Sequence, residues 1–234
     1  MKRLLHPFDR YRPWFRELAR YHRHLSWPGF WVRYEVSRLW SRDHEPPENA
    51  EESELRAFYA ACEYLLYRQV YYHRDRSFRW ITKYLPDSGN ICEYGCGVAP
   101  VTTWLADRRY HYTLVDIPNP ALTYARWRLA RRGVRFDVRS PGLGNDLPLQ
   151  DSYGLITCLE VLEHVPNPAE VVRHLIAHLT LGGRLLVNFV QGEPKGLNLA
   201  SAQRDRKAAM DLLGALYMER PMDADGGGVG VYRA

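Results

Sequence analysis

The sequence of 234 residues predicts an α/β fold: a doubly wound, mostly parallel sheet of seven strands, preceded by a helical N-terminal extension. Two observations carry this prediction. From residue 91 onward, short apolar segments with strand character alternate with segments of helical periodicity, which is typical of parallel sheets with helices on both faces. Before residue 91, apolar residues recur at intervals of three and four, which predicts helices. The 46% hydrophobic and 25% charged residues are those of a globular protein and exclude disordered, collagen-like and coiled-coil classes.

The first 42 residues are basic and rich in aromatic side chains. They carry ten Lys or Arg against three acids, an excess of +7 in a chain whose formal net charge is +5. They also hold ten aromatic residues, and Pro13, Pro28 and Gly29 interrupt them, so we expect two or three short helices. Such a charge asymmetry indicates an anionic partner. A helical extension with solvated arginines explains it as well.

A helical cap is expected between this segment and the sheet. Residues 43–54 hold six acids and a Pro-Pro pair, which predicts a linker. One helix is predicted over 55–72 and a second, short one over 78–85. We therefore assign 1–75 to an aromatic and Arg-rich extension and cap, and 76–234 to the sheet domain.

Strands and helices of the sheet domain follow in order. The helix after the second strand has Asn119 as its cap, Pro120 at its first position and Gly133 beyond its end. The helix that starts at Pro168 is expected to stop at the Gly pair 182–183. Further helices are expected at 100–108 and 202–213. The strands are expected at 91–94, 112–116, 134–138, 154–159, 184–190, 215–220 and 229–233.

A ligand site is expected where the first strand ends, because open parallel sheets bind ligands at the carboxyl ends of their strands. Residues 93–97 read Glu-Tyr-Gly-Cys-Gly, and the two glycines permit a tight turn and close approach of a ligand. Asp116 closes the second strand, where a carboxylate can accept both hydroxyls of a ribose. A dinucleotide site is the rival interpretation. Pro100 stands where its third glycine would be, however, and Glu93 suits a ligand with a cationic end.

This stretch resembles the class I S-adenosylmethionine (SAM) dependent methyltransferases, over about 76–234. The most specific part is Leu155-Ile-Thr-Cys-Leu-Glu-Val-Leu-Glu-His-Val-Pro-Asn-Pro168, followed by the Leu-Gly-Gly at 181–183. The chain is similar to type 11 and type 12 methyltransferases, nearest in pattern to the ubiquinone-biosynthesis O-methyltransferases. The resemblance implies a Rossmann-like sheet with an antiparallel last strand, and SAM as cofactor. It implies these cofactor-binding residues: Glu93, Gly95, Cys96 and Gly97 at the methionine end, Asp116 at the ribose, Ile117 at the adenine and Leu159 beside the sulfonium.

Candidate catalytic residues follow the fourth strand. Methyl transfer from a sulfonium mainly requires donor and acceptor to be held collinear, and a base is needed only where the acceptor loses a proton. Glu160 and His164 are the candidates, with Glu163 between them. In the resembled quinone O-methyltransferases and small-RNA terminal 2′-O-methyltransferases, Glu-x-x-Glu-His here is similar to a divalent-metal site. A helix start with a purely structural role is the other interpretation.

The resemblance implies a methyltransferase of a small molecule, with O-methylation as one form. The helix 55–72 and the loop 191–198 would cover the acceptor, and aromatic walls favour an aromatic or apolar acceptor. The expected wall residues are Tyr64, Tyr67, Tyr71 and Tyr72. One alternative is an RNA methyltransferase whose segment 1–42 grips single strands; another is a non-catalytic SAM-binding scaffold. Attachment of 1–42 to a membrane surface is compatible with the first function.

The sequence also sets expectations about location. It has no run of 18 apolar residues, so no transmembrane helix is expected, and its basic start lacks the apolar region of a signal peptide. The four cysteines have neither disulfide-framework nor CxxC spacing and are expected to be buried thiols. These features favour a cytoplasmic protein.

Overall fold

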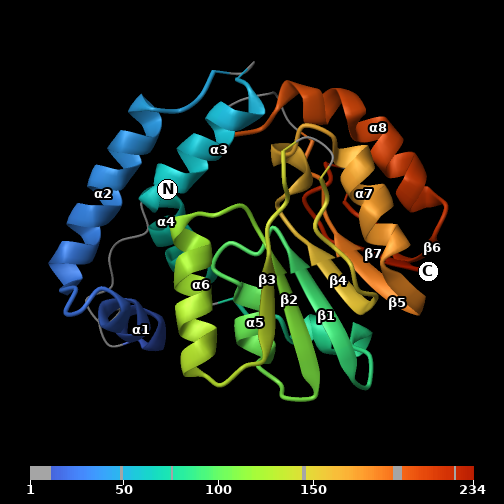
Figure 1. Cartoon of the computed structure of the whole chain (residues 1–234), viewed down its shortest axis with the longest axis horizontal. Helices are drawn as coiled ribbons and strands as arrows, with labels where there is room; N and C mark the ends of the chain where they lie inside the picture. Colours follow the sequence, from blue (N-terminus) through green and yellow to red (C-terminus); the bar gives the residue numbers. More distant parts are fainter. Residues whose placement is uncertain (1–11, 48–49, 75, 144–145, 192–196, 224) are drawn as a thin grey trace.

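The computed structural model of the protein describes residues 12–47, 50–74, 76–143, 146–191, 197–223 and 225–234. A seven-stranded sheet lies at its centre, in the order β3-β2-β1-β4-β5-β7-β6 (Figure 1). This confirms the predicted fold class. The strands are β1 (Gly89–Tyr94), β2 (Tyr110–Val115), β3 (Phe136–Arg139), β4 (Tyr153–Cys158), β5 (Leu179–Val187), β6 (Tyr217–Arg220) and β7 (Gly230–Arg233).

Strand pairing creates the edge at which the site lies. β1 pairs in parallel with β2 on one side and with β4 on the other, so the direction of winding reverses at β1. The register places Glu93 between Leu114 and Thr157. β7 is antiparallel to both of its neighbours, β5 and β6. The carboxyl ends of β1 and β4 thus flank the switch point, the usual place for a ligand in such sheets.

Helices cover the sheet and extend beyond it. In Figure 1, α7 and α8 lie together near β5, whereas α1 and α2 lie outermost, next to α6 and α4. Asn119 accepts a hydrogen bond from the backbone N–H of Leu122 (2.8 Å), which confirms the predicted cap of α6. The helices are α1 (Pro13–Tyr21), α2 (Trp27–Asp43), α3 (Glu52–Ala61), α4 (Glu63–His73), α5 (Pro100–Leu105), α6 (Pro120–Arg131), α7 (Pro168–Ala177) and α8 (Ala200–Gly214), with 3₁₀ turns η2 (Arg79–Tyr84) and η3 (Leu162–His164).

The single helix predicted over 55–72 is wrong, because the chain breaks at Cys62 into α3 and α4. Cys62 has φ −80° and ψ 85°, outside the helical region, and its N–H donates to the Tyr59 carbonyl. Phe58, Cys62 and Leu65 nevertheless pack in one apolar cluster across the break. The apolar periodicity therefore continues through the turn and could not reveal it.

Two helix ends also differ from the prediction. The Gly pair at 182–183 does not end α7, which finishes at Ala177; it lies inside β5. A Cβ at Gly183 would lie 2.8 and 2.9 Å from the carbonyl oxygens of Thr180 and Tyr153, so glycine is needed where β5 passes a register shift against β4. The helix expected over 100–108 ends earlier, at Leu105, because Ala106 takes a left-handed conformation.

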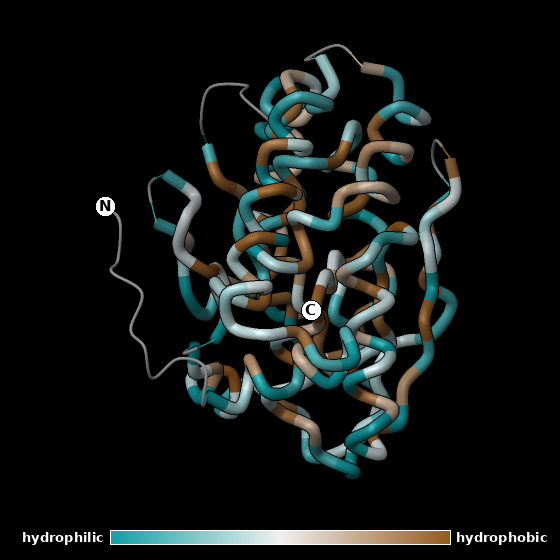
Figure 2. Tube along the Cα trace, turned by 90° about the vertical axis from the view of Figure 1, so that its left-hand side faces the viewer, coloured by the Kyte–Doolittle hydropathy of each residue, from teal (hydrophilic) through white to brown (hydrophobic). Residues whose placement is uncertain are grey.

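The extension packs against the sheet domain through aromatic side chains. Phe15, Leu18 and Phe30 of α1 and α2 are buried against Tyr67 of α4 and Tyr124 of α6. The described part of the segment forms two helices, as predicted, but α2 has 17 residues and is not short, because Pro28 lies in its first turn and does not interrupt it. Brown and teal segments alternate along the helical tubes in Figure 2, as expected of amphipathic helices.

No helix among the described residues is long and apolar enough to cross a membrane. All four cysteines are buried free thiols, as predicted: Cys62, Cys92, Cys96 and Cys158.

Candidate active site

A cavity of about 1270 Å³ opens at the carboxyl ends of β1, β2 and β4, between the sheet and helices α2 to α4. Its volume exceeds that of a pocket for one drug-sized ligand, so it has room for a cofactor and a second molecule. The predicted site residues that line it are Glu93, Gly95, Cys96, Asp116, Ile117, Leu159, Glu160 and His164, together with Glu163. Gly97 is buried next to the cavity and does not line it.

Glu93 holds the turn that follows β1. Its carboxylate accepts hydrogen bonds from the backbone N–H groups of Val101 (3.0 Å) and Thr102 (2.8 Å) in the first turn of α5. The side chain is only 5% exposed, and this burial raises the pKa of Glu93 to about 7 against the opposing effect of its hydrogen bonds. The sequence predicted that Glu93 meets the ligand. It did not predict that the Glu93 carboxylate also binds the first turn of α5.

Asp116 ties the end of β2 to the glycine turn. It accepts hydrogen bonds from the N–H of Gly97 (2.6 Å) and from the side-chain amide of Asn119 (3.0 Å). Burial raises the pKa of Asp116 to about 6, although these hydrogen bonds act in the opposite direction. The carboxylate therefore links two of the loops predicted to meet the cofactor.

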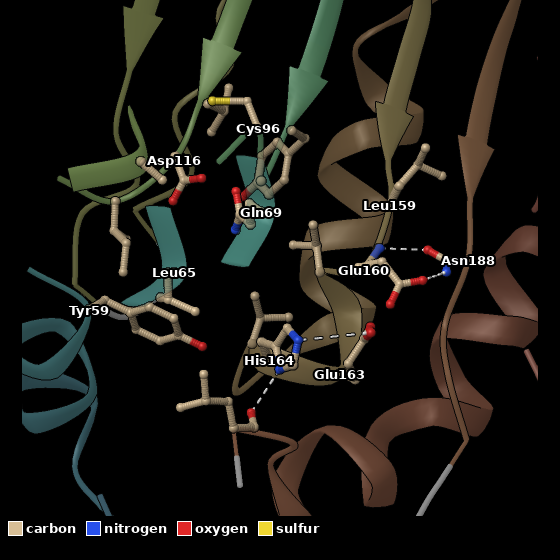
Figure 3. A pocket seen from close by; sticks show the side chains of 18 of the residues that line it. Tyr59, Leu65, Gln69, Cys96, Asp116, Leu159, Glu160, Glu163, His164 and Asn188 are labelled. Atoms are coloured by element: carbon tan, nitrogen blue, oxygen red, sulfur yellow. Dashed lines mark hydrogen bonds and ion pairs between the residues drawn. The ribbon is translucent and has the colours of Figure 1, made fainter. Parts of the chain in front are cut away.

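Gln69 reaches the same turn from α4, and nothing in the sequence pointed to it. Its Oε1 accepts a hydrogen bond from the N–H of Val98 (3.0 Å). Gly97 has φ +50°, and a Cβ there would collide with the Gln69 side chain. Figure 3 shows Gln69 between Cys96 and Leu65, at the inner end of the cavity.

Glu160 is held in an uncommon backbone conformation by Asn188. Its φ is +59°, in the left-handed region that costs a non-glycine residue energy. Asn188, only 2% exposed, accepts from the Glu160 N–H (2.7 Å) and donates to the Glu160 carboxylate (2.5 Å). Figure 3 shows these two hydrogen bonds at the carboxyl ends of β4 and β5. They fix where the Glu160 carboxylate lies.

Glu163 and His164 form the other polar pair of the cavity. Glu163 is 2% exposed, its Oε2 has no hydrogen-bond partner among the described residues, and burial together with the Glu160 charge raises its pKa to about 7. His164 Nδ1 lies 2.8 Å from the Leu197 carbonyl oxygen, and its Nε2 lies 4.0 Å from Glu163 Oε1. Because a carbonyl can only accept, Nδ1 carries the proton. Burial lowers the pKa of His164, so the neutral ring presents a free Nε2 lone pair.

The divalent-metal interpretation of Glu160, Glu163 and His164 stays a prediction. In the part of the chain that the structure describes, no group of three His, Cys, Asp or Glu side chains is arranged to hold an ion. Glu160, Glu163 and His164 line the same cavity, and Asn188 donates a hydrogen bond to the Glu160 carboxylate.

The predicted tyrosine wall is half right. Tyr64 and Tyr72 line the cavity, whereas Tyr67 and Tyr71 face the other way, into the aromatic cluster with α1 and α2. Tyr59 of α3 lines the cavity instead, and Figure 3 shows its hydroxyl directed toward His164. Ser140, which follows β3, does not line the cavity. Most of the predicted loop 191–198 lies outside the described residues.

Comparison with known proteins identifies the class. A family profile described as a methyltransferase domain matches residues 64–223, more than half of the chain. The chain therefore belongs to the methyltransferase-domain family. The SAM-bound amino pentose methyltransferase CalS10 of Micromonospora echinaspora shares the fold, with a TM-score of 0.51 and 18% identity over 72% of this chain and 96% of that one.

Curated relatives are found at higher identity over a shorter stretch. The ubiquinone biosynthesis O-methyltransferase of Marinobacter nauticus is 33% identical over 111 residues, which is 46% of this chain and 47% of the relative. The corresponding protein of Stutzerimonas stutzeri is 30% identical over 125 residues, 52% of this chain and 53% of the relative. The chain thus spans about half the length of the curated relatives it matches.

Proposed function

We propose that the protein is a SAM-dependent methyltransferase that transfers a methyl group to a hydroxyl of a small-molecule acceptor. The observation that carries the proposal is the acidic carboxyl edge of the sheet, where Glu93, Asp116 and Glu160 line one cavity next to a glycine turn. The family match and the names of the curated relatives support the same activity.

The residues of this edge suit the cofactor chemically. SAM supplies an electrophilic methyl group on a cationic sulfonium, and it also carries an amino group and a ribose. Glu93 and Glu160 offer negative charge to the cationic groups, and Asp116 offers acceptors to the ribose hydroxyls. Gly95 and Gly97, with φ +67° and +50°, shape the turn that would lie against the methionine chain. Ile117, Cys96 and Leu159 supply apolar contacts.

His164 is the proposed base. Its Nε2 takes the proton from the acceptor hydroxyl, and the Leu197 carbonyl keeps Nδ1 protonated so that the lone pair stays on Nε2. Glu163, 4.0 Å away, stabilises the imidazolium that forms. Glu160, which Asn188 holds in position, would lie beside the sulfonium. Holding both molecules in line supplies much of the remaining acceleration.

The acceptor is proposed to be aromatic or apolar in its main body. Phe58, Tyr59, Tyr64 and Leu65 line the cavity on its helical side. The aromatic rings of α1 and α2, in contrast, pack against each other and the domain, so the described part of the extension offers few free rings for stacking RNA bases. We place the division between cap and sheet domain near residue 75, and the protein in the cytoplasm, where four free thiols are stable.

Calorimetry with S-adenosylhomocysteine tests the proposal. The wild type should bind in the micromolar range. Asp116→Ala should lower affinity about tenfold to a few hundredfold, because charge-assisted hydrogen bonds are worth about 1.5–3 kcal/mol each. Asp137→Ala, an exposed carboxylate on β3 that pairs with His111 outside the cavity, is the matched control and should bind normally. If the folded wild type does not bind S-adenosylhomocysteine, the proposal is wrong.

A further inference from the structure

Charges of opposite sign line the two sides of the cavity. Five acids lie on the sheet side, on or after β1, β2 and β4 and in α7, and one arginine lies there, Arg220. Five arginines lie on the helical side, in α2, α3 and α4 or just after, along with two acids, Glu45 and Glu52. The sheet-side acids are Glu93, Asp116, Glu160, Glu163 and Glu170, and the helical-side arginines are Arg38, Arg42, Arg56, Arg68 and Arg76.

Most of these arginines already have partners within the chain. Arg38 pairs with Glu35 and Arg42 with Asp43, at 2.8 and 2.9 Å. Arg56 pairs with Glu52 and donates to two backbone carbonyls, and Arg76 lies on the ring of Tyr72.

Arg68 differs from them. Its side chain lines the cavity and is exposed to solvent. It makes neither an ion pair nor a hydrogen bond with any residue that the structure describes. Leu65, Arg68 and Gln69 share one face of α4 by their spacing, and all three line the cavity.

The Arg68 charge acts on the proposed reacting centre. Burial is the main cause of the lowered pKa of His164, and the positive charge of Arg68 adds to it. The same charge opposes the rise that burial causes in the pKa of Tyr59. Arg68 therefore acts electrostatically on the two polar groups of the acceptor side, opposite the acids that suit the cationic cofactor.

We propose that the acceptor carries a negatively charged group, a carboxylate, and that Arg68 binds it while the acceptor hydroxyl lies at His164. The inference rests on the proposed function and names its substrate class: a hydroxylated aromatic or apolar acid. A guanidinium that has no ion-pair or hydrogen-bond partner among the described residues can form a bidentate pair with a carboxylate. A cationic cofactor on one side and an anionic acceptor on the other also match the charge division of the cavity.

The test compares two probes that differ by one charge. 3,4-Dihydroxybenzoate and its methyl ester are titrated into the full-length protein loaded with S-adenosylhomocysteine, and binding is measured by calorimetry. The wild type should bind the acid about tenfold more tightly than the ester, in line with one charge-assisted hydrogen-bonded pair. Arg68→Gln should abolish that preference and leave the Kd of S-adenosylhomocysteine unchanged. Arg42→Gln, which removes a paired arginine from the same wall, should keep the preference.

Different outcomes would contradict the carboxylate proposal and the proposed methyltransferase function. Equal binding of acid and ester by the wild type, or binding of neither, overturns the carboxylate proposal while the cofactor site stands. Weaker S-adenosylhomocysteine binding by Arg68→Gln would assign the arginine to the cofactor and also overturn it. Salt-dependent binding of single-stranded RNA that disappears in Arg68→Gln would replace the small acid by a phosphate backbone. Failure of the wild type to bind S-adenosylhomocysteine at all counts against the proposed function itself.

Discussion

At the carboxyl edge of the sheet, side chains are held by hydrogen bonds to backbone groups, whereas α1 and α2 are held to the domain mainly by aromatic packing. Glu93, Asp116 and Asn188 each bind at least one backbone N–H. In the extension, Phe15 and Phe30 instead contact other rings, mostly edge to face. The positions of the side chains at the edge thus depend on individual hydrogen bonds, whereas the position of the extension depends on the apolar area that it buries. A single substitution should therefore affect function at the first and stability at the second.

The largest expected effect is on stability, from the extension. Phe30 is fully buried, so Phe30→Ala should lower the free energy of unfolding by about 3–5 kcal/mol and the melting temperature by roughly 10 °C. Val36→Ala, on the same helix but 61% exposed, should change it by less than about 0.5 kcal/mol. Thermal denaturation distinguishes them. An unchanged melting temperature for Phe30→Ala would mean that the extension does not stabilise the domain.

A change at the edge should remove function instead. Gly97→Leu places a side chain against Gln69 at φ +50°, so we expect roughly a hundredfold or greater loss of S-adenosylhomocysteine affinity. Circular dichroism should show that the variant remains folded. Cys96→Ser, one residue away, should bind within a few-fold of the wild type. A severe loss from Cys96→Ser would show that the thiol contacts the ligand in a way that the glycine turn does not explain.

The buried acids predict a pH dependence. Burial raises the pKa of Glu163 from 4.5 to about 7, so the folded state binds this proton more tightly than the unfolded chain does. The Glu163 contribution to stability is therefore largest below pH 4.5 and is lost as the pH rises through 7. Relative to the wild type, Glu163→Gln should gain about 2 kcal/mol between pH 5 and 7.5 in urea titrations. Glu170→Gln, an acid of the same cavity paired with Arg173 near the surface, should show no such trend.

The smallest effect should come from the ion pairs between the extension and α6. Glu17 lies 2.9 Å from Arg132 and 3.6 Å from Arg128. Because these pairs are partly exposed, Glu17→Gln should cost about 0.5–1 kcal/mol. Glu35→Gln, which breaks the exposed pair with Arg38, should cost less still. A Glu17→Gln cost equal to that of Phe30→Ala would contradict the view that packing holds the extension.

Local spacing predicted the sheet, the glycine turn and the candidate carboxylates Glu93 and Asp116, because strands, caps and turns are encoded within a few residues. The resemblance to a family supplied the other candidate residues. The partners that complete the site come from farther away. Gln69 meets Val98 across 29 residues, Asn188 meets Glu160 across 28, and the Leu197 carbonyl meets His164 across 33. No local pattern marks such pairs, and an Asn or Gln in an apolar segment has many other uses. The helix break at Cys62 was not predicted because the apolar periodicity continues through it without interruption.

Gln69 crosses from the helical cover to the glycine turn, so a ligand that takes the Val98 N–H must first displace this amide. The same helix carries Arg68 into the acceptor side, one residue away. If the cofactor displaces the Gln69 side chain, we expect the neighbouring Arg68 side chain to change its position on the proposed acceptor side of the cavity. Initial-rate kinetics should then follow a compulsory order, cofactor before acceptor, and a dead-end acceptor analogue should inhibit uncompetitively with respect to the cofactor.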